Sequence, residues 1–440
     1  MTPTVARTAV PTVARTAGRA DPSMSAPATE RASGLRLGRP ALARCVADPE
    51  RFPREVWGRA PQLSRAEDLP GDVADLLSRE DVDELLSTRG LRTPFLRVAR
   101  RGETLPSRDF TAPGGVGAGI ADQVSDERLT ALFADGATIV LQALHRTWPP
   151  LVDFAQDLAA ELGHPVQVNA YVTPPQSQGF SDHYDVHDVF VLQVEGAKRW
   201  MVRAPVHPAP LRDQPWTDHA DDVRQAAQDE PLLDVVLHPG DCLYLPRGFL
   251  HAATALSEVC THLTIGVHTW TRHTVAEELA GAALVVLADD PEVRGPLPLG
   301  ADVGSVDAVA PDLERVRARM HRAIDGIDAE VLAGRLARRS REAQRAAPIG
   351  PLAQHRAAET ADAGTRVALR RHLQARLRPS PRGHVLESRA GSVEVAARDL
   401  PSVERLLDGE PARVGDLPGA GDSDLDLVRR LLALGVLVPA

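Results

Sequence analysis

The sequence predicts an α+β protein built on a barrel or jelly roll of short strands, with helical segments before and after it. Between residues 137 and 268, short apolar stretches alternate with Gly, Pro and Asp turns, a spacing typical of antiparallel barrels and jelly rolls. Beyond residue 270 the apolar residues recur at the spacing of a helix. A chain of 440 residues with 43% hydrophobic residues is long enough for two or three domains.

Composition narrows the class of function. The formal net charge of −10 disfavours a general nucleic-acid binder, because binding a phosphate backbone requires a basic face. A basic partner protein is favoured instead. No apolar run approaches the ~20 residues of a membrane-spanning helix, so we expect no membrane span. The three cysteines lie far apart without a C-x-x-C pair, which suits the reducing cytoplasm.

Residues 1–35 predict a disordered tail. They contain Pro-Thr-Val-Ala-Arg-Thr-Ala twice, at 3–9 and 11–17, and too few large apolar residues to form a core. The absence of a continuous apolar stretch excludes a secretory signal and leaves an Arg-rich transit peptide as the alternative.

The predicted elements of the barrel follow in order. A helical pattern at 81–86 and a strand at 95–98 precede it. We then expect a helix at 125–133, a strand at 137–144, a helix at 149–162 and strands at 166–172, 189–194, 199–203, 232–237, 241–245 and 262–268. In the helix at 149–162, large apolar residues recur at steps of three and four. Two prolines stand at its start, where a missing N–H costs nothing.

Residues 213–234 form an acid-rich insert between two of these strands, with seven acidic residues against one arginine. A solvated loop and helix is the ordinary interpretation of such a charge run. The functional interpretation is a docking surface for a basic protein.

Beyond the barrel we expect helices at 274–288 and 311–345. From about residue 365, a hairpin over 384–396, helices at 402–407 and 425–434 and a closing strand at 436–438 predict a small separate unit.

His183 and Asp185 are the first candidate metal ligands. In a strand, side chains two positions apart point to the same face, so these two can bind one ion. His251, which follows a Pro/Gly turn, is the candidate third ligand. Two histidines and one carboxylate on one face of an octahedral ion leave three positions open, as in non-haem Fe(II) oxygenases. The alternative is a buried polar cluster without a metal.

His187 is a rival ligand, because it would share the face of His183 and Asp185. At roughly 3.3 Å of rise per residue it would lie about 13 Å from His183 along a strand, too far for ~2.1 Å bonds to one ion. We therefore expect His187 to line or support the pocket.

The candidate ligands belong to an ordered set of motifs. The set comprises Asn169-x-Tyr171, Gln178-Gly179, His183-x-Asp185, Val189–Gln193, Gly196-x-Lys198-x-Trp200, Leu245–Gly248 with His251, and Thr261–Ile265. It resembles the metal-binding core of the JmjC (cupin-type) 2-oxoglutarate oxygenases, in particular the ribosomal oxygenases. The resemblance implies a double-stranded β-helix core that binds Fe(II) through His183, Asp185 and His251. It also implies 2-oxoglutarate and O2 as cosubstrates.

Lys198 is the single lysine among the 50 Lys and Arg residues. The resemblance assigns it to the distal carboxylate of 2-oxoglutarate, with hydrogen bonds from Asn169 and Tyr171 nearby. A surface lysine is the alternative. Gly266 departs from the family pattern, because the resembled enzymes often carry a serine after the Thr-Ile pair that helps hold the cosubstrate.

We expect four parts: a disordered tail (1–35), a JmjC/cupin catalytic domain (36–270), a helical dimerisation region (271–360) and a small winged-helix-like domain (361–440). The dimerisation and winged-helix roles are implied by the resemblance. It also implies a homodimer that hydroxylates a ribosomal protein. The net charge favours a basic one, and the cysteine pattern favours the cytoplasm. A hydroxylase of a small natural product and a non-catalytic cupin scaffold are the two alternatives.

Overall fold

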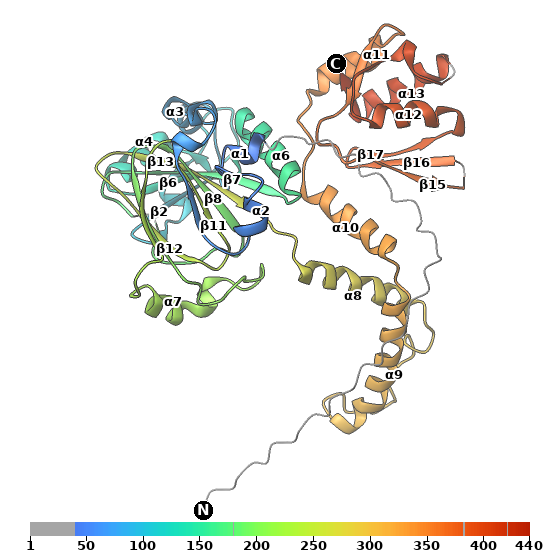
Figure 1. Cartoon of the computed structure of the whole chain (residues 1–440), viewed down its shortest axis with the longest axis horizontal. Helices are drawn as coiled ribbons and strands as arrows, with labels where there is room; N and C mark the ends of the chain where they lie inside the picture. Colours follow the sequence, from blue (N-terminus) through green and yellow to red (C-terminus); the bar gives the residue numbers. More distant parts are fainter. Residues whose placement is uncertain (1–39, 179, 382, 420) are drawn as a thin grey trace, which may run out of the picture. The chain divides into compact units, whose positions relative to one another are not determined.

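The computed structural model describes residues 40–178, 180–381, 383–419 and 421–440 (Figure 1). The tail predicted for residues 1–35 and Gly179 of the Gln-Gly motif lie outside the described residues. In the described ranges, no helix has both the length and the apolarity that crossing a bilayer requires.

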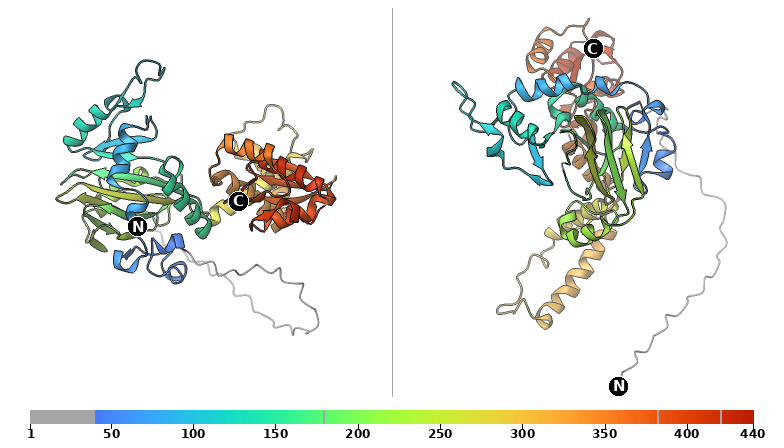
Figure 2. Two further views of the ribbon diagram at one scale, coloured as in Figure 1. Left: turned by 90° about the horizontal axis from the view of Figure 1, so that it is seen from above. Right: turned by 90° about the vertical axis from the view of Figure 1, so that its left-hand side faces the viewer.

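An eight-stranded antiparallel sheet organises the region before residue 270 (Figures 1 and 2). Its strand order is β1-β11-β8-β13-β7-β6-β2-β3. The strands are β1 (Gln62–Ser64), β2 (Leu96–Arg100), β3 (Glu103–Thr104), β6 (Thr138–Leu141), β7 (Val166–Thr173), β8 (Asp188–Glu195), β11 (Cys242–Leu245) and β13 (Cys260–Val267). Because β13 pairs with both β7 and β8, three of the sequence motifs become neighbours on one sheet.

A second, three-stranded sheet has the order β10-β9-β12. Its strands are β9 (Lys198–Arg203), β10 (Leu233–Leu237) and β12 (Leu250–Ala255). The two sheets share an inner apolar core of Val189, Val191, Trp200, Val202, Leu237, Leu243 and Leu245. The predicted barrel or jelly roll is therefore confirmed.

The strand β12 was not expected from the sequence. Its residues Leu-His-Ala-Ala-Thr-Ala show little apolar alternation, so local pattern did not reveal it. Pairing with β9, from Leu250↔Arg203 to Ala255↔Lys198, defines it instead. This matters because β12 carries His251.

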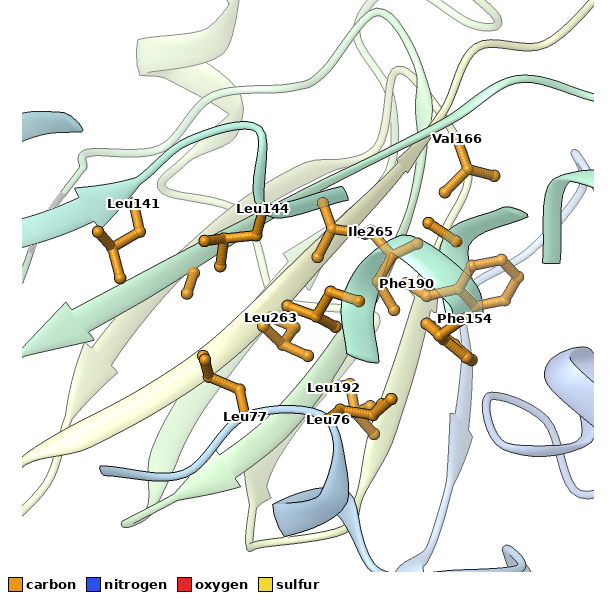
Figure 3. Packing of buried hydrophobic residues seen from close by; sticks show 14 of the residues in the cluster. Leu76, Leu77, Leu141, Leu144, Phe154, Val166, Phe190, Leu192, Leu263 and Ile265 are labelled. Atoms are coloured by element: carbon orange, nitrogen blue, oxygen red, sulfur yellow. The ribbon is translucent and has the colours of Figure 1, made fainter. Parts of the chain in front are cut away.

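The outer face of the large sheet is covered by a second apolar core (Figure 3). Phe190 and Leu192 of β8 point into it, while Val189 and Val191 of the same strand point into the inner core. This burial on both faces explains the continuous apolar run in β8. The helix α6 (Pro149–Leu162), predicted with these bounds, packs Phe154 against the outer face, where burying such a side chain stabilises the fold by roughly 1.5–3 kcal/mol.

The strand predicted for 137–144 is shorter in the structure. β6 ends at Leu141, and a short helix, α5 (Leu144–Thr147), follows. Ala143 has a left-handed backbone (φ 58°) that ends the strand, and its N–H donates to Asn169 Oδ1 at 3.0 Å. The side chain of a neighbouring strand thus stabilises this turn.

Short elements complete this region. They are α1 (Pro40–Ala43), α2 (Phe52–Glu55), α3 (Arg79–Ser87), β4 (Thr111–Ala112), β5 (Gln123–Val124), α4 (Asp126–Ala134) and α7 (Ala220–Ala226). The helix α4 agrees with the prediction for 125–133, and Ser125 caps it by accepting from the N–H of Arg128. The insert over 213–234 contains α7, as expected for a loop and helix.

Three helices follow the sheets: α8 (Arg272–Ala288), α9 (Val306–Asp325) and α10 (Ala329–Ala343). The single helix predicted for 311–345 is wrong, because the structure contains two helices there. Gly326 is the C-cap of α9, and Asp328, whose backbone is extended, is the N-cap of α10.

The C-terminal residues form their own apolar core. Two three-stranded sheets, β18-β14-β19 and β15-β16-β17, accompany three helices. The elements are α11 (Pro351–Thr360), β14 (Arg366–Leu369), β15 (Arg376–Ser380), β16 (Gly383–Ser388), β17 (Gly391–Val395), α12 (Leu400–Leu407), β18 (Ala412–Arg413), α13 (Asp422–Ala433) and β19 (Leu437–Pro439). The predicted hairpin is confirmed as the pair β16–β17.

Candidate metal centre

His183 and His251 face each other across an isolated β-bridge. The backbone N–H of His183 donates to the carbonyl of His251 at 3.3 Å, and that of His251 donates back at 2.9 Å. The ring centroids lie 4.4 Å apart. Because His251 also pairs with Val202 in β12 and β9, the backbone alone brings the two imidazoles together.

Asp185 approaches the two histidines from the loop that precedes β8. Its backbone carbonyl accepts from the N–H of Gly248 at 3.0 Å, and its Oδ2 lies 3.8 Å from His251 Nε2. One ligand atom from each of His183, Asp185 and His251 lies within 4.8 Å of the other two. The three side chains therefore form a cluster that could hold one metal ion.

The strand assumed for residues 183–187 is not formed, because β8 begins at Asp188. The two ligands nevertheless point the same way. Tyr184 between them is 1% exposed, packs with Val223 and Leu250 and donates its hydroxyl to the carbonyl of Gln214 at 3.1 Å. Packing of Tyr184 under the acid-rich insert therefore directs His183 and Asp185 to the same side, as strand alternation was expected to do.

Backbone carbonyls orient both imidazoles. His183 Nδ1 lies 2.7 Å from the carbonyl oxygen of Ser181, and His251 Nδ1 lies 3.1 Å from that of Phe249. A carbonyl oxygen only accepts, so each Nδ1 carries the hydrogen and each Nε2 is left with a free lone pair. Histidine ligands of metals are commonly held by such hydrogen bonds.

The protonation states also suit a divalent cation. Burial, assisted by the neighbouring His183, lowers the pKa of His251 to about 4. For Asp185, burial opposes ionisation, but His187, His251 and His183 outweigh it and the pKa falls below its ordinary value. At neutral pH the cluster thus presents an uncharged His251 and an ionised Asp185, the forms that bind a metal.

Lys198 lies in the same pocket as these three residues. It begins β9 and is 4% exposed, and its Nζ donates to Thr173 Oγ1 at 3.4 Å. No salt bridge in the described part of the chain gives it an acidic partner. Burial lowers its pKa to about 8, an effect that Cys260 opposes. A buried ammonium without a carboxylate is costly, so the pocket suits an anionic ligand.

Tyr171 and Asn169 lie on the same side of β7, but the structure uses them differently. Tyr171 lines the pocket, and its ring stacks on His262 at 5.0 Å with an interplanar angle of 10°. Asn169 is not among the residues that line the pocket, and its Oδ1 holds Ala143. Lys198 and Tyr171 are therefore brought to the metal cluster more directly than Asn169.

The His187 ring explains why a glycine stands at position 266. A Cβ at position 266 would lie 2.4 Å from Cδ2 of the His187 ring, so only glycine leaves room for it. His187 also hydrogen bonds with Gln167 at 3.2 Å and stacks on His268 at 5.4 Å. Among the described residues, the metal-ligand cluster does not include His187, in agreement with a supporting role.

Several pocket residues were missed from the sequence. Thr138, Phe180 and Thr264 line the pocket, and Arg97 lies with its Cζ 5.6 Å from the Phe180 ring centroid. Alternation along the expected strands could have placed Thr138 and Thr264 on the pocket face. Arg97 gave no signal, because only the pairing of β2 with β6 brings it near.

A buried network supports the start of β8. Asp188 accepts from the Tyr244 hydroxyl at 2.6 Å and from the N–H of Arg247 at 3.1 Å. The Tyr244 oxygen in turn accepts from the N–H of Gly58 at 2.9 Å. This network ties the loop of Asp185 to the turn that leads to β12.

Comparison with known protein families identifies part of the chain. Residues 149–275 match the family model described as JmjC domain, so this part of the chain is a JmjC domain. The match covers the three candidate metal ligands and Lys198.

Curated proteins with similar sequences include two kinds of oxygenase. Ribosomal oxygenase 1 of Gallus gallus is 35% identical over 258 residues, which cover 58% of this chain and 41% of that protein. The bifunctional lysine-specific demethylase and histidyl-hydroxylase NO66 of Aedes aegypti is 31% identical over 223 residues, which cover 50% of this chain and 33% of that protein. The chain thus spans less than half the length of these relatives.

Solved structures with a similar fold include the Escherichia coli ribosomal oxygenase YcfD. One structure has a TM-score of 0.52 at 16% identity and covers 90% of this chain and 99% of that chain. Another, of YcfD in complex with cobalt and succinic acid, has a TM-score of 0.50 at 16% identity and covers 88% and 97%. At this identity the likeness shows the JmjC/cupin fold.

Proposed function

We propose that this chain is an Fe(II)- and 2-oxoglutarate-dependent dioxygenase that hydroxylates a side chain of a basic ribosomal protein. The observation that carries the proposal is one pocket that contains both the triad of His183, Asp185 and His251 and the buried ammonium of Lys198. A metal-bound keto acid requires a metal site with open positions beside a cation, and Lys198 pairs with no carboxylate among the described residues. The relatives named as ribosomal oxygenases support the substrate class.

The residues of this chain would bind and orient the metal and the cosubstrate, and they would exclude water from the pocket. His183, Asp185 and His251 would hold the metal, and Lys198 with Tyr171 would hold 2-oxoglutarate. Asn169, whose Oδ1 is engaged by Ala143, would offer its amide nitrogen. When bound, Fe(II), 2-oxoglutarate and O2 supply an oxidative hydroxylation that releases succinate and CO2.

A basic protein substrate is supported by the acid-rich insert. Its exposed acidic residues are Asp213, Asp218, Asp221, Asp222, Asp229 and Glu230. The insert packs on Tyr184, between two of the candidate ligands, so a partner that binds it would lie close to the metal. A hydroxylase of a small natural product has no need of this surface, and a non-catalytic scaffold has no need of the triad. The net charge of −10 does not favour nucleic acid as a partner.

We further propose a cytoplasmic homodimer built on residues 271–360. Leu284, Val285 and Val286 of α8 are 57%, 60% and 52% exposed, and α9 adds exposed Leu313 and Val316. A second copy of the chain is the partner that would bury them. We also propose residues 36–270 as the catalytic domain and residues 361–440 as a winged-helix-like domain. The helices α12 and α13 and the two small sheets support the second assignment, and α11 packs against the same core.

The proposed function is tested by incubating the protein with Fe(II), 2-oxoglutarate, O2 and a ribosomal extract. We expect one ribosomal protein to gain the mass of one oxygen atom, and a His183→Ala protein to leave the extract unchanged. Loss of a methyl group with release of formaldehyde would show that the reaction is a demethylation and not a hydroxylation. Consumption of 2-oxoglutarate without any change in ribosomal proteins would favour a small-molecule substrate.

A further inference from the structure

We infer that Arg97 is a positioning residue, which donates a hydrogen bond to the Tyr171 oxygen and so directs the Tyr171 O–H toward the bound cosubstrate. This inference rests on the proposed function and adds to it a residue from outside the JmjC match at 149–275.

The strand register places Arg97 and Tyr171 on one face. Arg97 pairs with Val140 between β2 and β6, and Val140 pairs with Tyr171 between β6 and β7. Directly opposed residues of antiparallel strands point to the same face. The neighbours Val98 and Ile139 point into the outer core instead. Arg97 therefore belongs to the pocket face of the sheet.

The distance between the two residues suits their side chains. One intervening strand separates them, so their backbones lie roughly 9.6 Å apart at about 4.8 Å per strand. Only the short Val140 stands between them. A long arginine and a long tyrosine that extend over a valine can meet at their polar ends.

The contacts of Arg97 form a cluster at the pocket wall. Its guanidinium lies over the Phe180 ring at 5.6 Å, and Phe180 meets Tyr171 edge to face at 6.1 Å. Within the described ranges no salt bridge gives Arg97 a carboxylate partner, and its Nε is buried without a hydrogen bond. The guanidinium therefore lies against the Phe180 ring beside Tyr171, and its charge also helps to lower the pKa of Asp185.

The electrostatics agree with this contact. Burial raises the pKa of Tyr171, and Arg97 opposes that rise through its charge and through a hydrogen bond to the hydroxyl. Arginine has donors only, so in this bond the tyrosine oxygen accepts. The single hydrogen of Tyr171 must then point elsewhere.

The pocket is the direction that remains for this hydrogen. The stack on His262 holds the Tyr171 ring, and Arg97 occupies one side of its oxygen. A tyrosine polarised by a cation is a stronger donor, and its bond to a carboxylate is charge-assisted. Arg97 would therefore strengthen binding of 2-oxoglutarate without touching it.

A double-mutant cycle on 2-oxoglutarate affinity tests this inference. The binding constant is measured by calorimetry with Mn(II) in the metal site for wild type, Arg97→Met, Tyr171→Phe and the double variant. We expect each single substitution to weaken binding about five- to tenfold. The double variant should bind no more weakly than Tyr171→Phe alone, because Arg97 acts through the tyrosine.

Two further variants separate positioning from general stability. Arg100→Met lies on the same strand but on the opposite face, where Arg100 pairs with Asp135, and should leave the affinity unchanged. Arg97→Lys keeps a cationic donor and should recover most of the affinity that Arg97→Met loses. If Arg97→Met does not fold, Arg97→Lys replaces it in the comparison with wild type. The 2-oxoglutarate affinities are compared at saturating Mn(II), because the charge of Arg97 also acts on the candidate ligand Asp185.

The outcomes distinguish this inference from the proposed function. Losses of Arg97→Met and Tyr171→Phe that multiply in the double variant would show that Arg97 acts independently of Tyr171. An unchanged affinity in Arg97→Met would also overturn the inference, and either result leaves the proposed function intact. A wild-type protein that binds no 2-oxoglutarate would overturn both.

Discussion

Replacing Lys198 by methionine should make the protein more stable and weaken its affinity for 2-oxoglutarate well over tenfold. Lys198 is 4% exposed, and its nearest hydrogen-bond partner, Thr173, is neutral and 3.4 Å away. Methionine has a similar length and no charge, so it fills the same space without the cost of desolvating an ammonium.

The size of the stabilisation follows from the pKa of Lys198. Burial lowers it from 10.5 to about 8, which at 1.36 kcal/mol per pKa unit corresponds to roughly 3 kcal/mol against folding. The folded protein binds fewer protons than the unfolded chain between these two values. The cost is therefore fully present below pH 8 and disappears as the pH rises to 10.5.

The loss of affinity has a similar magnitude. If the distal carboxylate of 2-oxoglutarate pairs with Lys198, its removal leaves a buried charge unpaired, a loss on the order of 2–5 kcal/mol. Binding should then weaken well over tenfold. Lys198→Arg should also weaken it, because a planar guanidinium does not occupy the space of an ammonium.

Urea unfolding of the metal-free protein at pH 7 and pH 10 measures the change in stability. Calorimetry with Mn(II) in the metal site measures the change in 2-oxoglutarate affinity. We expect the stability difference between Lys198→Met and wild type to shrink at pH 10. A methionine variant that is less stable than wild type at pH 7, or three proteins with equal 2-oxoglutarate affinity, would refute this reasoning.

Three other predictions concern the ligands, the glycine beside them and the assembly. His183→Ala and Asp185→Ala should each abolish metal-dependent turnover of 2-oxoglutarate, because the triad loses both affinity and geometry; undiminished turnover by either variant would remove that residue from the site. Gly266→Ala should lower the free energy of unfolding by about 1–3 kcal/mol, because its Cβ would lie 2.4 Å from the His187 ring. His187→Ala in the same protein should restore much of that loss in urea unfolding, whereas equal stability of Gly266→Ala and wild type would contradict the packing argument. Light scattering at micromolar concentration should give the mass of two chains for wild type and of one chain for Leu284→Glu, and a monomeric wild type would count against the dimer.

Much of the candidate site could be predicted because its signals are local. His183 and Asp185 stand two positions apart, and Lys198 is the single lysine of the chain. The helix α6 was predicted with its bounds, because proline stands at its start and its apolar residues repeat at helical spacing. Its C-cap, Gly163, adopts the left-handed backbone common at helix ends.

Predictions from local pattern failed where the pattern was weak or where one residue changed the backbone. β12 is rich in small residues and shows little apolar alternation, so its pairing with β9 defines it. The left-handed Ala143 ends β6 early, and its position depends on Asn169 from another strand. Gly326 and Asp328 divide the helix that the sequence pattern made continuous.

The sequence by itself determined the kinds of groups in the pocket: two imidazoles, a carboxylate and a lone ammonium, in a chain whose short apolar segments form strands. The tertiary structure decided which other side chains join them. Arg97 meets Tyr171 only through the register of β2, β6 and β7, and His187 needs Gly266 only because β13 passes beside it. The physical reason is that strand register depends on burying the apolar face of the whole sheet, and no single segment of the chain contains that information.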